Sequence, residues 1–372
     1  MKKSVAIVYN TSEYAFKFKK NLILALKQNN YDVMVIAPFD RYSDRLRELG
    51  VTYVRLDMDR KGHNPLAELL LIVQFVKVFK RAAPDVILNF TIKPNIYGAI
   101  AAALVSRPTI SNVTGLGTLF IKSGFALSLV KILYKVAFKF PNKVFFQNID
   151  DKCLFEDLKL VRSEKAELIP GSGVDIERFS PGQPSETGPK VRFLYVGRIL
   201  KDKGVMEFVG AAQLLLAKHG NVEFQLLGGL DEDNPTAITH DQVRQWQSDG
   251  IINYLGYIED VGPFLNSADI VVLPSYREGM PRTILEASAS GKPVIATDVP
   301  GCRDAVVDGV TGYLCKVKDT ASLADAMERM LIDGPDKRRE IGVNGRQRML
   351  EVFDERIVTG KYIETIAAIF NP

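Results

Sequence analysis

The chain has 372 residues, of which 47% are hydrophobic and 25% charged, so it is long enough for two globular domains. Its three cysteines and three histidines are not spaced like metal ligands, which argues against a disulfide framework and a metal centre. The amino terminus lacks a signal-peptide pattern and no 18 apolar residues follow one another, so a cytoplasmic protein without transmembrane helices is expected.

The net charge of +4 is divided unevenly between the two halves of the chain. Residues 1–170 contain 26 Lys and Arg against 15 Asp and Glu, whereas residues 171–372 contain 22 against 29. The first half is therefore expected to meet something anionic, such as a diphosphate, a membrane surface or a nucleic acid.

The first half alternates short apolar strands with helical stretches, which indicates right-handed βαβ units and a parallel sheet. After a linker-like segment rich in proline and glycine at 170–189, a second series of strands begins. The pattern predicts two doubly wound α/β domains, with strands at Ser4–Tyr9, Asp32–Ala37, Thr52–Arg55, Asp85–Asn89, Thr109–Val113, Lys143–Gln147, Arg192–Val196, Glu223–Leu227, Ile251–Leu255, Asp269–Leu273 and Pro293–Thr297.

A dinucleotide-dependent oxidoreductase is the main rival for this architecture, and its G-x-G-x-x-G fingerprint should follow a strand and open a helix. Residues 10–14, after the first strand, contain no glycine. Gly228 and Gly229, after the strand at 223–227, are not part of such a fingerprint either. The oxidoreductase is therefore nearly excluded.

The most informative segment is E-G-M-P-R-T-I-L-E, residues 278–286. Pro281 is expected at the first position of a helix and Gly291 at its left-handed stop. The backbone N–H groups of about residues 280 to 284 would then lack intrahelical partners and suit a phosphate. A glutamate at each end adds acceptors for hydroxyl groups, so the segment predicts a nucleotide-sugar site.

The spacing E-x7-E resembles the signature of the retaining glycosyltransferases of family four. The resemblance implies that Glu278 lies against the donor sugar and Glu286 holds the ribose hydroxyls. The alternative is that Glu278 caps the helix and Glu286 pairs with Arg282 one turn back. The donor-binding residues implied for this segment are Glu278, Gly279, Met280, Pro281, Arg282, Thr283 and Glu286.

The segment G-R-I-L-K-D-K-G, residues 197–204, resembles the G-R-x4-K-G motif of the family, whose cations grip the donor diphosphate. Fixed cations are needed there because negative charge builds on the diphosphate as the sugar leaves. The alternative is a solvated basic turn. The resemblance implies catalytic roles for Arg198, Lys203 and Glu278, with no metal and no cofactor, and further donor contacts from Gly197, Gly228, Gly229 and Tyr257.

The first domain carries N-V-T-G-L-G at 112–117 and F-T-I-K-P-N-I-Y-G at 90–98. Both resemble the branch of the family that builds surface polysaccharides and lipid-linked oligosaccharides, including an enzyme that adds α1,3-linked N-acetylgalactosamine to a polyprenyl-diphosphate-linked sugar. Lys93 is a candidate for the acceptor diphosphate, although a surface lysine is an equal alternative. The acceptor-binding residues implied are Asn10, Ser12, Lys93, Asn95, Gly115, Leu116 and Gly117.

The chain departs from many family members because residues 89–95 contain no histidine, which puts a histidine general base in doubt. Retaining transfer does not strictly require one, since the departing phosphate oxygen can take the acceptor proton. No carboxylate pair in the first domain suggests a nucleophile for double displacement.

A predicted helix over Ser123–Phe140 carries Lys131, Lys135 and Lys139 four residues apart on an otherwise apolar, aromatic-rich background. Such a helix suits the interface of an anionic membrane. The alternative is an ordinary buried helix with one solvated face.

Taken over the chain, the resemblance implies a GT-B fold, with two Rossmann-like domains facing a cleft. Residues 1–170 would face the acceptor and membrane, residues 171–353 would bind the nucleotide sugar, and residues 354–372 would form a helix that crosses back. The implied activity is metal-independent, retaining transfer of a hexose or N-acetylhexosamine, with α1,3-linked N-acetylgalactosamine preferred, from a UDP-sugar to a polyprenyl-diphosphate-linked saccharide. This enzyme would be peripheral on the inner face of the cell membrane and would have no nucleic-acid partner. The alternatives are a GT-B nucleotide-sugar epimerase and a non-catalytic, basic membrane-binding protein.

Overall fold

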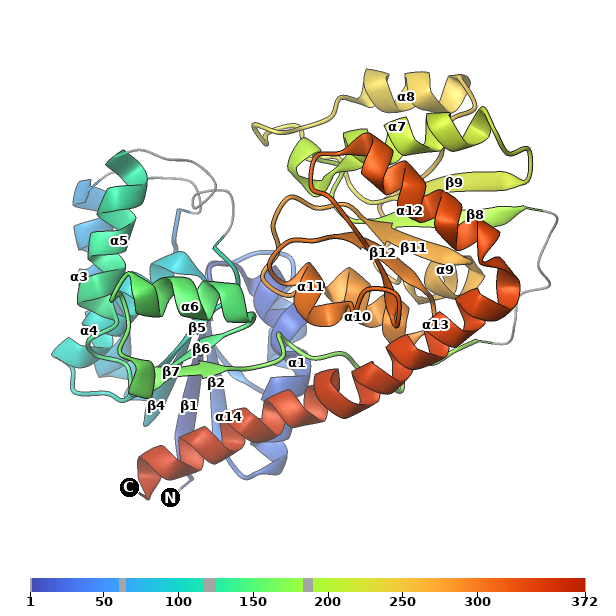
Figure 1. The fold of residues 1–372 in the computed structure, drawn as a ribbon. Helices are drawn as coiled ribbons and strands as arrows, with labels where there is room; N and C mark the ends of the chain where they lie inside the picture. The colour runs from blue at the N-terminus through green and yellow to red at the C-terminus, as the bar shows by residue number, and fades with distance from the viewer. Residues whose placement is uncertain (1, 60–64, 117–124, 183–189, 372) are drawn as a thin grey trace. The chain divides into compact units, whose positions relative to one another are not determined.

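The computed structural model describes residues 2–59, 65–116, 125–182 and 190–371. The chain divides into two units, of which unit 1 comprises residues 1–172 and 356–372 and unit 2 comprises residues 173–355 (Figure 1). Each unit is built on its own parallel sheet. None of the described helices is both long enough and apolar enough to cross a membrane.

Unit 1 contains a seven-stranded sheet in the order β3-β2-β1-β4-β5-β6-β7. Its strands are β1 (Ser4–Val8), β2 (Asp32–Ala37), β3 (Thr52–Arg55), β4 (Val86–Phe90), β5 (Thr109–Val113), β6 (Lys143–Phe146) and β7 (Ala166–Leu168). Its helices are α1 (Ser12–Gln28), α2 (Ser43–Glu48), α3 (Pro65–Ala82), the π-helix η1 (Pro94–Gly98), α4 (Ala99–Leu104), α5 (Phe125–Ala137), α6 (Ile149–Asp157), the 3₁₀ turn η3 (Ser163–Lys165) and α14 (Glu355–Phe370).

Unit 2 contains a six-stranded sheet in the order β10-β9-β8-β11-β12-β13. Its strands are β8 (Val191–Val196), β9 (Val222–Leu227), β10 (Asn253–Gly256), β11 (Ile270–Leu273), β12 (Val294–Thr297) and β13 (Gly312–Cys315). Its helices are the 3₁₀ turn η4 (Lys201–Lys203), α7 (Val205–Leu216), α8 (His240–Ser248), α9 (Gly262–Ser267), α10 (Arg282–Ala289), α11 (Cys302–Ala305), α12 (Thr320–Ile332), α13 (Gly334–Arg348) and the π-helix η5 (Met349–Phe353).

Both faces of each sheet are covered by helices, which explains the nearly continuous apolar runs of the central strands. In unit 1, α1 and α14 pack on one face, and α3 and α4 pack on the other. In unit 2, α7, α8 and α12 cover one face, and α9, α10 and α11 cover the other. This arrangement confirms the predicted doubly wound α/β class. The pattern did not predict the two edge strands β7 and β13, which are only three and four residues long.

The last helix, α14, completes the core of unit 1. The buried Tyr362 packs edge-on against Phe145, with ring centroids 5.2 Å apart, and its hydroxyl donates to the Asn112 side chain on β5. The Lys19 ammonium group of α1 lies 5.8 Å from the Tyr362 ring centroid. Helix α14 is therefore part of unit 1, although unit 2 separates it from the rest of that unit in the sequence.

The chain enters unit 2 at Gly173 and leaves it at Glu355, and these two points touch. The Val174 N–H donates to the Phe353 carbonyl at 2.8 Å, and the Glu355 N–H donates to the Val174 carbonyl at 3.1 Å. A Cβ at Gly173, whose φ is +70°, would overlap the Glu355 backbone. Glycine is required here because two backbone segments run in direct contact.

Gly204 allows the loop after β8 to pack under the end of β11. Its φ is +74°, and a Cβ there would overlap the Pro274 carbonyl oxygen. Gly250 has a similar φ of +70° but has open space around its Cβ position.

We expect Gly250→Ala to lower the free energy of unfolding by about 1 kcal/mol from backbone strain alone, and Gly204→Ala to lower it by at least about 2 kcal/mol more. Urea unfolding followed by circular dichroism measures both, and equal midpoints for the two variants would contradict the steric explanation.

Candidate active site

The candidate site residues of unit 2 lie at the carboxyl edge of its sheet. The chain leaves β8 to form β9 on one side, and it later forms β11 on the other side of β8. The carboxyl ends of the paired strands β8 and β11 are therefore the topological switch point, where open α/β sheets bind their ligands. The segment after β8 carries Arg198 and Lys203, and the segment after β11 carries Glu278.

The two motifs meet in an ion pair. The Lys203 Nζ lies 2.5 Å from the Glu278 Oε1, although 75 residues separate them in the sequence. Their side chains are only 19% and 15% exposed, so the pair is shielded from water more than a surface ion pair. The structure thus brings together two of the three predicted catalytic residues.

Tyr195, which sequence reasoning missed, holds the loop that carries both cations. Its ring is buried in the strand β8, and its hydroxyl lies 2.9 Å from the Arg198 carbonyl and 3.4 Å from the Lys203 carbonyl. Burial raises the pKa of Tyr195 well above its ordinary value, and the nearby Glu278 charge raises it further. The phenol therefore stays protonated and serves as a donor to the loop. Its only signal in the sequence is a tyrosine in an apolar strand.

Arg198 is placed differently from Lys203. Its side chain is half exposed, and its Nη1 lies 3.5 Å from the Asp231 Oδ2, which is a long contact for an ion pair. Asp231 in turn lies 3.4 Å from the Asn234 amide. The Arg198 guanidinium is thus only loosely held by the loop after β9, and it can turn toward an anion at little cost.

Close backbone approaches explain the glycines of the site. A Cβ at Gly228 would overlap the Gly197 carbonyl oxygen, so both loops can approach each other only with glycine at this position. A Cβ at Gly229 would lie 3.6 Å from the ring of the exposed Tyr257. Gly197, Gly228, Gly229 and Tyr257 therefore form one continuous surface beside Arg198.

Gly301 is a second residue that the sequence did not single out. It precedes α11, and a Cβ there would overlap the Gly279 carbonyl oxygen and lie 3.0 Å from that of Glu278. The Gly301 N–H donates to the Asp304 carboxylate at 3.0 Å, which caps the turn. The turn before α11 therefore supports the backbone of the segment 278–279 from behind.

The start of α10 differs from the prediction. Pro281 is the N-cap of the helix, in extended conformation, and not its first helical residue. The Ile284 N–H donates to the Pro281 carbonyl at 3.1 Å, and proline has no N–H, so the free donors do not extend over residues 280 to 284 as expected. The Thr283 hydroxyl donates to the Val196 carbonyl at 3.2 Å. The predicted stop is confirmed, because Gly291 follows the helix with a φ of +71°.

Glu286 pairs with Arg282, as the alternative to a ribose contact predicted. Its Oε1 lies 2.7 Å from the Arg282 Nη2, one turn earlier on α10, and the side chain is only 11% exposed. Burial raises the pKa of Glu286 above its ordinary value of 4.5, and the charges of Arg282 and Arg178 partly offset this rise. The pair with Arg282 does not exhaust the carboxylate, which has further lone pairs for hydroxyl donors.

Two of the acceptor candidates lie beside β1, where unit 1 has its own switch point between β1 and β4. Asn10 lines a cavity of about 550 Å³ together with Thr11, Asp40 and Met58. Ser12 is fully buried, and its hydroxyl donates to the Pro38 carbonyl at 2.7 Å. Asn10 is thus open to a ligand, whereas Ser12 holds the loop in place.

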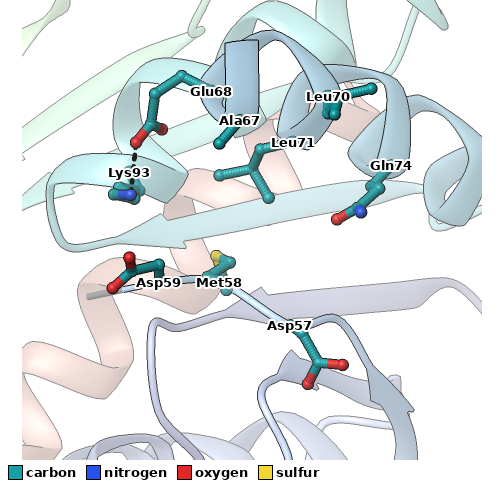
Figure 2. Close-up of a pocket in the computed structure, with 9 residues that line it drawn as sticks. All are labelled: Asp57, Met58, Asp59, Ala67, Glu68, Leu70, Leu71, Gln74 and Lys93. Atoms are coloured by element: carbon teal, nitrogen blue, oxygen red, sulfur yellow. Dashed lines mark hydrogen bonds and ion pairs between the residues drawn. The ribbon is translucent and has the colours of Figure 1, made fainter. Parts of the chain in front are cut away.

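Lys93 lies in a neighbouring cavity of about 230 Å³ (Figure 2). Its Nζ is 2.6 Å from the Glu68 Oε1 on α3, and both side chains are less than 15% exposed. Asp57 and Asp59 line the same cavity, so its charge is negative despite the lysine. Glu68 neutralises the charge of Lys93, which was the residue predicted to bind the acceptor diphosphate. The cavity as a whole therefore suits hydroxyl groups better than a phosphate.

The remaining acceptor candidates are Asn95, Gly115, Leu116 and Gly117. The Asn95 amide is buried and bonded to the backbone of Asn112, at 2.7 Å from its carbonyl and 3.1 Å from its N–H. Leu116 is also buried, and Gly115 adopts a φ of +117°. Gly117 lies outside the described residues. Asn95 and Leu116 therefore serve the packing of unit 1.

In the described part of the chain, no three His, Cys, Asp or Glu residues are arranged to hold a metal ion. Cys302 and Cys315 are buried, and burial raises the pKa of both thiols, that of Cys315 to about 12. These thiols are therefore poor metal ligands and poor nucleophiles at neutral pH.

Two family models match the chain, Glycosyl transferase 4-like over residues 4–148 and Glycosyl transferases group 1 over residues 190–333. The N,N'-diacetylbacillosaminyl-diphospho-undecaprenol alpha-1,3-N-acetylgalactosaminyltransferase of Campylobacter jejuni is 31% identical to it over 365 residues, which cover 94% of each chain. The chain belongs to the retaining glycosyltransferases of family four.

Further relatives agree with this assignment. The capsular polysaccharide biosynthesis glycosyltransferase CapM of Staphylococcus aureus is 28% identical to this glycosyltransferase over 78% of this chain and 79% of its own. Sucrose-phosphate synthase of Thermosynechococcus elongatus has the same fold, with a TM-score of 0.82 at 20% identity and full coverage of both chains. HepE of Anabaena, solved in complex with UDP and glucose, has a TM-score of 0.80 at 20% identity, covering 98% of this chain and all of its own. The predicted family and GT-B fold are confirmed.

The raised pKa of Glu286 predicts a pH-dependent effect on the stability of this glycosyltransferase. Ionised Glu286 costs folding free energy, so the stability that the protonated form provides is lost as the pH rises above about 4.5. We expect the melting temperature of Glu286→Gln, relative to that of the wild type, to increase between pH 4 and pH 8. Glu340→Gln, on the exposed surface of α13, is the control and should show no such trend. A constant difference for Glu286→Gln across this range would argue that Arg282 fully compensates for burial.

Proposed function

We propose that this glycosyltransferase transfers N-acetylgalactosamine in α1,3 linkage from a UDP-sugar to a polyprenyl-diphosphate-linked saccharide. The observation that carries the proposal is the similarity to the Campylobacter jejuni enzyme, which extends over 94% of both chains. A second relative supports the acceptor class, since a UDP-Gal:alpha-D-GlcNAc-diphosphoundecaprenol alpha-1,3-galactosyltransferase of Escherichia coli is 26% identical over 72% of each chain. HepE, which has the same fold, was solved with UDP.

In this proposal the ion pair between Lys203 and Glu278 opens when the donor binds. The diphosphate takes Lys203 as its counter-ion and recruits Arg198, whose present partner is 3.5 Å away. Glu278 is then released to accept a hydrogen bond from a hydroxyl of the donor sugar. The exchange replaces one buried pair by two, so neither the lysine nor the glutamate is left without a partner in the low-dielectric site.

The nucleoside lies along the glycine-rich surface beside these groups. The second oxygen of Glu286 accepts from the ribose hydroxyls, and Arg282 keeps the carboxylate in position. The exposed ring of Tyr257 and the backbone after β10 face the uracil base. This arrangement uses Gly197, Gly228, Gly229 and residues 279–283 as the walls of the donor site.

The transfer itself follows from the charges at the switch point. The bond from the anomeric carbon to the diphosphate oxygen breaks, and its electron pair stays on UDP, where Arg198 and Lys203 stabilise it without a metal ion. The acceptor hydroxyl forms the new bond on the same face of the sugar. Its proton passes to the departing phosphate oxygen, because residues 89–95 provide no histidine to take it.

The acceptor saccharide is assigned to the cavities at the carboxyl edge of unit 1. The cavity with Asn10 and the cavity with Lys93 share Met58, so they adjoin. Asn10 offers an amide, and the pair of Lys93 and Glu68 offers both a donor and an acceptor to sugar hydroxyls. We assign this region to the sugars of the acceptor.

Peripheral attachment to an anionic membrane surface on the cytoplasmic side accounts for two amphipathic helices of unit 1. On α5, Lys131 and Lys135 accompany the exposed apolar side chains of Leu129, Ile132 and Val136, and Lys139 and the exposed Phe140 follow in the turn after the helix. On α3, four apolar side chains are exposed, Leu66, Leu69, Leu70 and Val73, and Lys77, Lys80 and Arg81 follow. Both helices contact η1. Exposed apolar side chains combined with lysines suit the lipid headgroup region.

The donor assignment is tested with UDP binding and sugar transfer. We expect Glu286→Ala to weaken UDP binding about tenfold or more, since it removes a hydrogen bond to a charged group. Glu278→Ala should not weaken UDP binding, since Lys203 then has no ion pair to leave, and it should lower kcat about 100-fold or more, since Glu278 acts on the sugar. Calorimetry with UDP and transfer of radiolabelled N-acetylgalactosamine from its UDP form to a polyprenyl-diphosphate-linked sugar measure both.

Glu340→Ala is the matched control and should change neither quantity. Equal UDP affinity in the wild type and Glu286→Ala would refute the ribose assignment. Conversion of UDP-N-acetylgalactosamine to an isomer without acceptor would identify an epimerase. Binding of GDP in place of UDP would redirect the search for the donor.

The membrane assignment predicts that neutralising Lys131, Lys135 and Lys139 to Gln lowers partitioning onto phosphatidylglycerol vesicles. At about 1 kcal/mol for each lysine near the surface, the loss is on the order of 100-fold at low salt. Ile132→Ser should weaken binding without changing the charge. Gln at Lys218, Lys316 and Lys337 of unit 2 provides the charge-matched control. Unchanged co-sedimentation of the first variant at low salt would refute the assignment.

A further inference from the structure

A cavity of about 360 Å³ lies at the opposite edge of the unit 2 sheet from the donor motifs. It is formed where α10 ends and β12 begins, against one side of α13. The donor motifs lie at the carboxyl edge of this sheet, whereas Gly291 and Lys292 directly precede β12 at its amino edge. The lining residues are Pro181, Gly182, Ser290, Gly291, Lys292, Arg339, Val343, Arg346 and Gln347.

The lining of this cavity is basic. It contains the cations Lys292, Arg339 and Arg346 and no Asp or Glu. The Lys292 Nζ donates to the Asn266 carbonyl at 2.8 Å, which leaves two of its three N–H donors for other partners. Burial lowers the pKa of Lys292, so an anion placed beside it would stabilise its charged form. Arg339 is exposed at the rim.

Ser290 supplies an independent sign of a ligand. It is only 2% exposed, and its hydroxyl has no hydrogen-bond partner in the described part of the chain. Buried hydroxyl groups are nearly always bonded, so an unpaired one on a residue that lines a cavity leaves a donor for a group that binds there. A hydroxyl donor beside an ammonium group and a guanidinium group matches the acceptor oxygens of a phosphate.

Arg346 removes the main electrostatic objection to an anion at this place. The carboxyl end of a helix carries partial negative charge, and the cavity lies at the end of α10. The guanidinium of Arg346 donates to the Ala289 carbonyl at that helix end, to the Phe179 carbonyl at 2.9 Å and to the Ile176 carbonyl at 3.1 Å. These bonds neutralise the helix end and hold the cavity wall in place.

We propose that this cavity is a second phosphate site, which binds a phosphate monoester of a small molecule separately from the UDP-sugar. Lys292, Arg339 and the Ser290 hydroxyl hold the phosphate, and the volume beside Val343 and Gln347 takes the rest of the molecule. Helix α10 carries Glu286 in its middle and Ser290 at its end, so the occupied cavity stabilises the helix on which the donor motif is built. The link to donor binding rests on the proposed function, whereas the phosphate site itself does not.

The experiment titrates glucose 1-phosphate into protein saturated with UDP, so that the donor site is already filled, and follows binding by calorimetry. We expect a dissociation constant of about 1 mM or tighter for the wild type and at least a fivefold loss in Arg339→Gln. Lys337→Gln is the matched control, because it removes the same charge from a partly exposed position on the same helix, outside the cavity lining. Inorganic phosphate should displace glucose 1-phosphate.

Equal losses in Arg339→Gln and Lys337→Gln would reduce the effect to general surface charge and overturn the proposal. Absence of binding to the wild type at about 10 mM would also overturn it. Glucose 1-phosphate that inorganic phosphate does not displace would refute recognition through the phosphate. UDP affinity is also measured for each variant in the absence of glucose 1-phosphate. If Arg339→Gln loses glucose 1-phosphate binding but keeps its UDP affinity, the effect belongs to this cavity and not to the donor site of the proposed function.

Discussion

The ion pair between Lys203 and Glu278 depends on backbone segments that approach one another more closely than side chains allow. Gly204 lies against the end of β11, Gly228 against Gly197, and Gly301 against the backbone behind Glu278. Each glycine removes a Cβ that would push one loop away from the switch point. The cations and the carboxylate are thus brought together at one edge of the sheet by steric fit, and the electrostatics of the site follow from that fit.

Much of this site could be predicted from the sequence because its chemistry is encoded locally. The segments 197–204 and 278–286 each carry their charged residues within a single loop, and the strands before them are recognisable as apolar runs. Gly301 could not be predicted in the same way, since its role arises from contact with the backbone of residues 278–279, in a separate loop. Tyr195 directly precedes the loop that it holds, but a tyrosine in an apolar strand does not reveal that its hydroxyl bonds to that loop. The predicted start of α10 was wrong by one residue, because proline suits both an extended N-cap and the first turn of a helix.

Charge in unit 1 illustrates a different limit. The excess of lysine and arginine in residues 1–170 predicted an anionic partner for the domain, and Lys93 was a natural candidate for a phosphate contact. In the fold, Lys93 is paired with Glu68 in a cavity that also contains Asp57 and Asp59, while exposed lysines accompany apolar side chains on α3 and α5. A charge count gives the average over a domain, whereas binding depends on which charges the fold leaves unpaired and where it gathers them.

The position of α14 has a consequence for how the protein is made. Unit 2 is a continuous stretch of chain, but the core of unit 1 includes Val358, Tyr362 and Ile366, which are synthesised after the whole of unit 2. During synthesis, residues 1–172 therefore emerge before unit 2, yet unit 1 cannot close its core until α14 has emerged as well. Unit 1 is completed only after unit 2 has been made, and until then the face of its sheet that α14 covers needs other protection from aggregation.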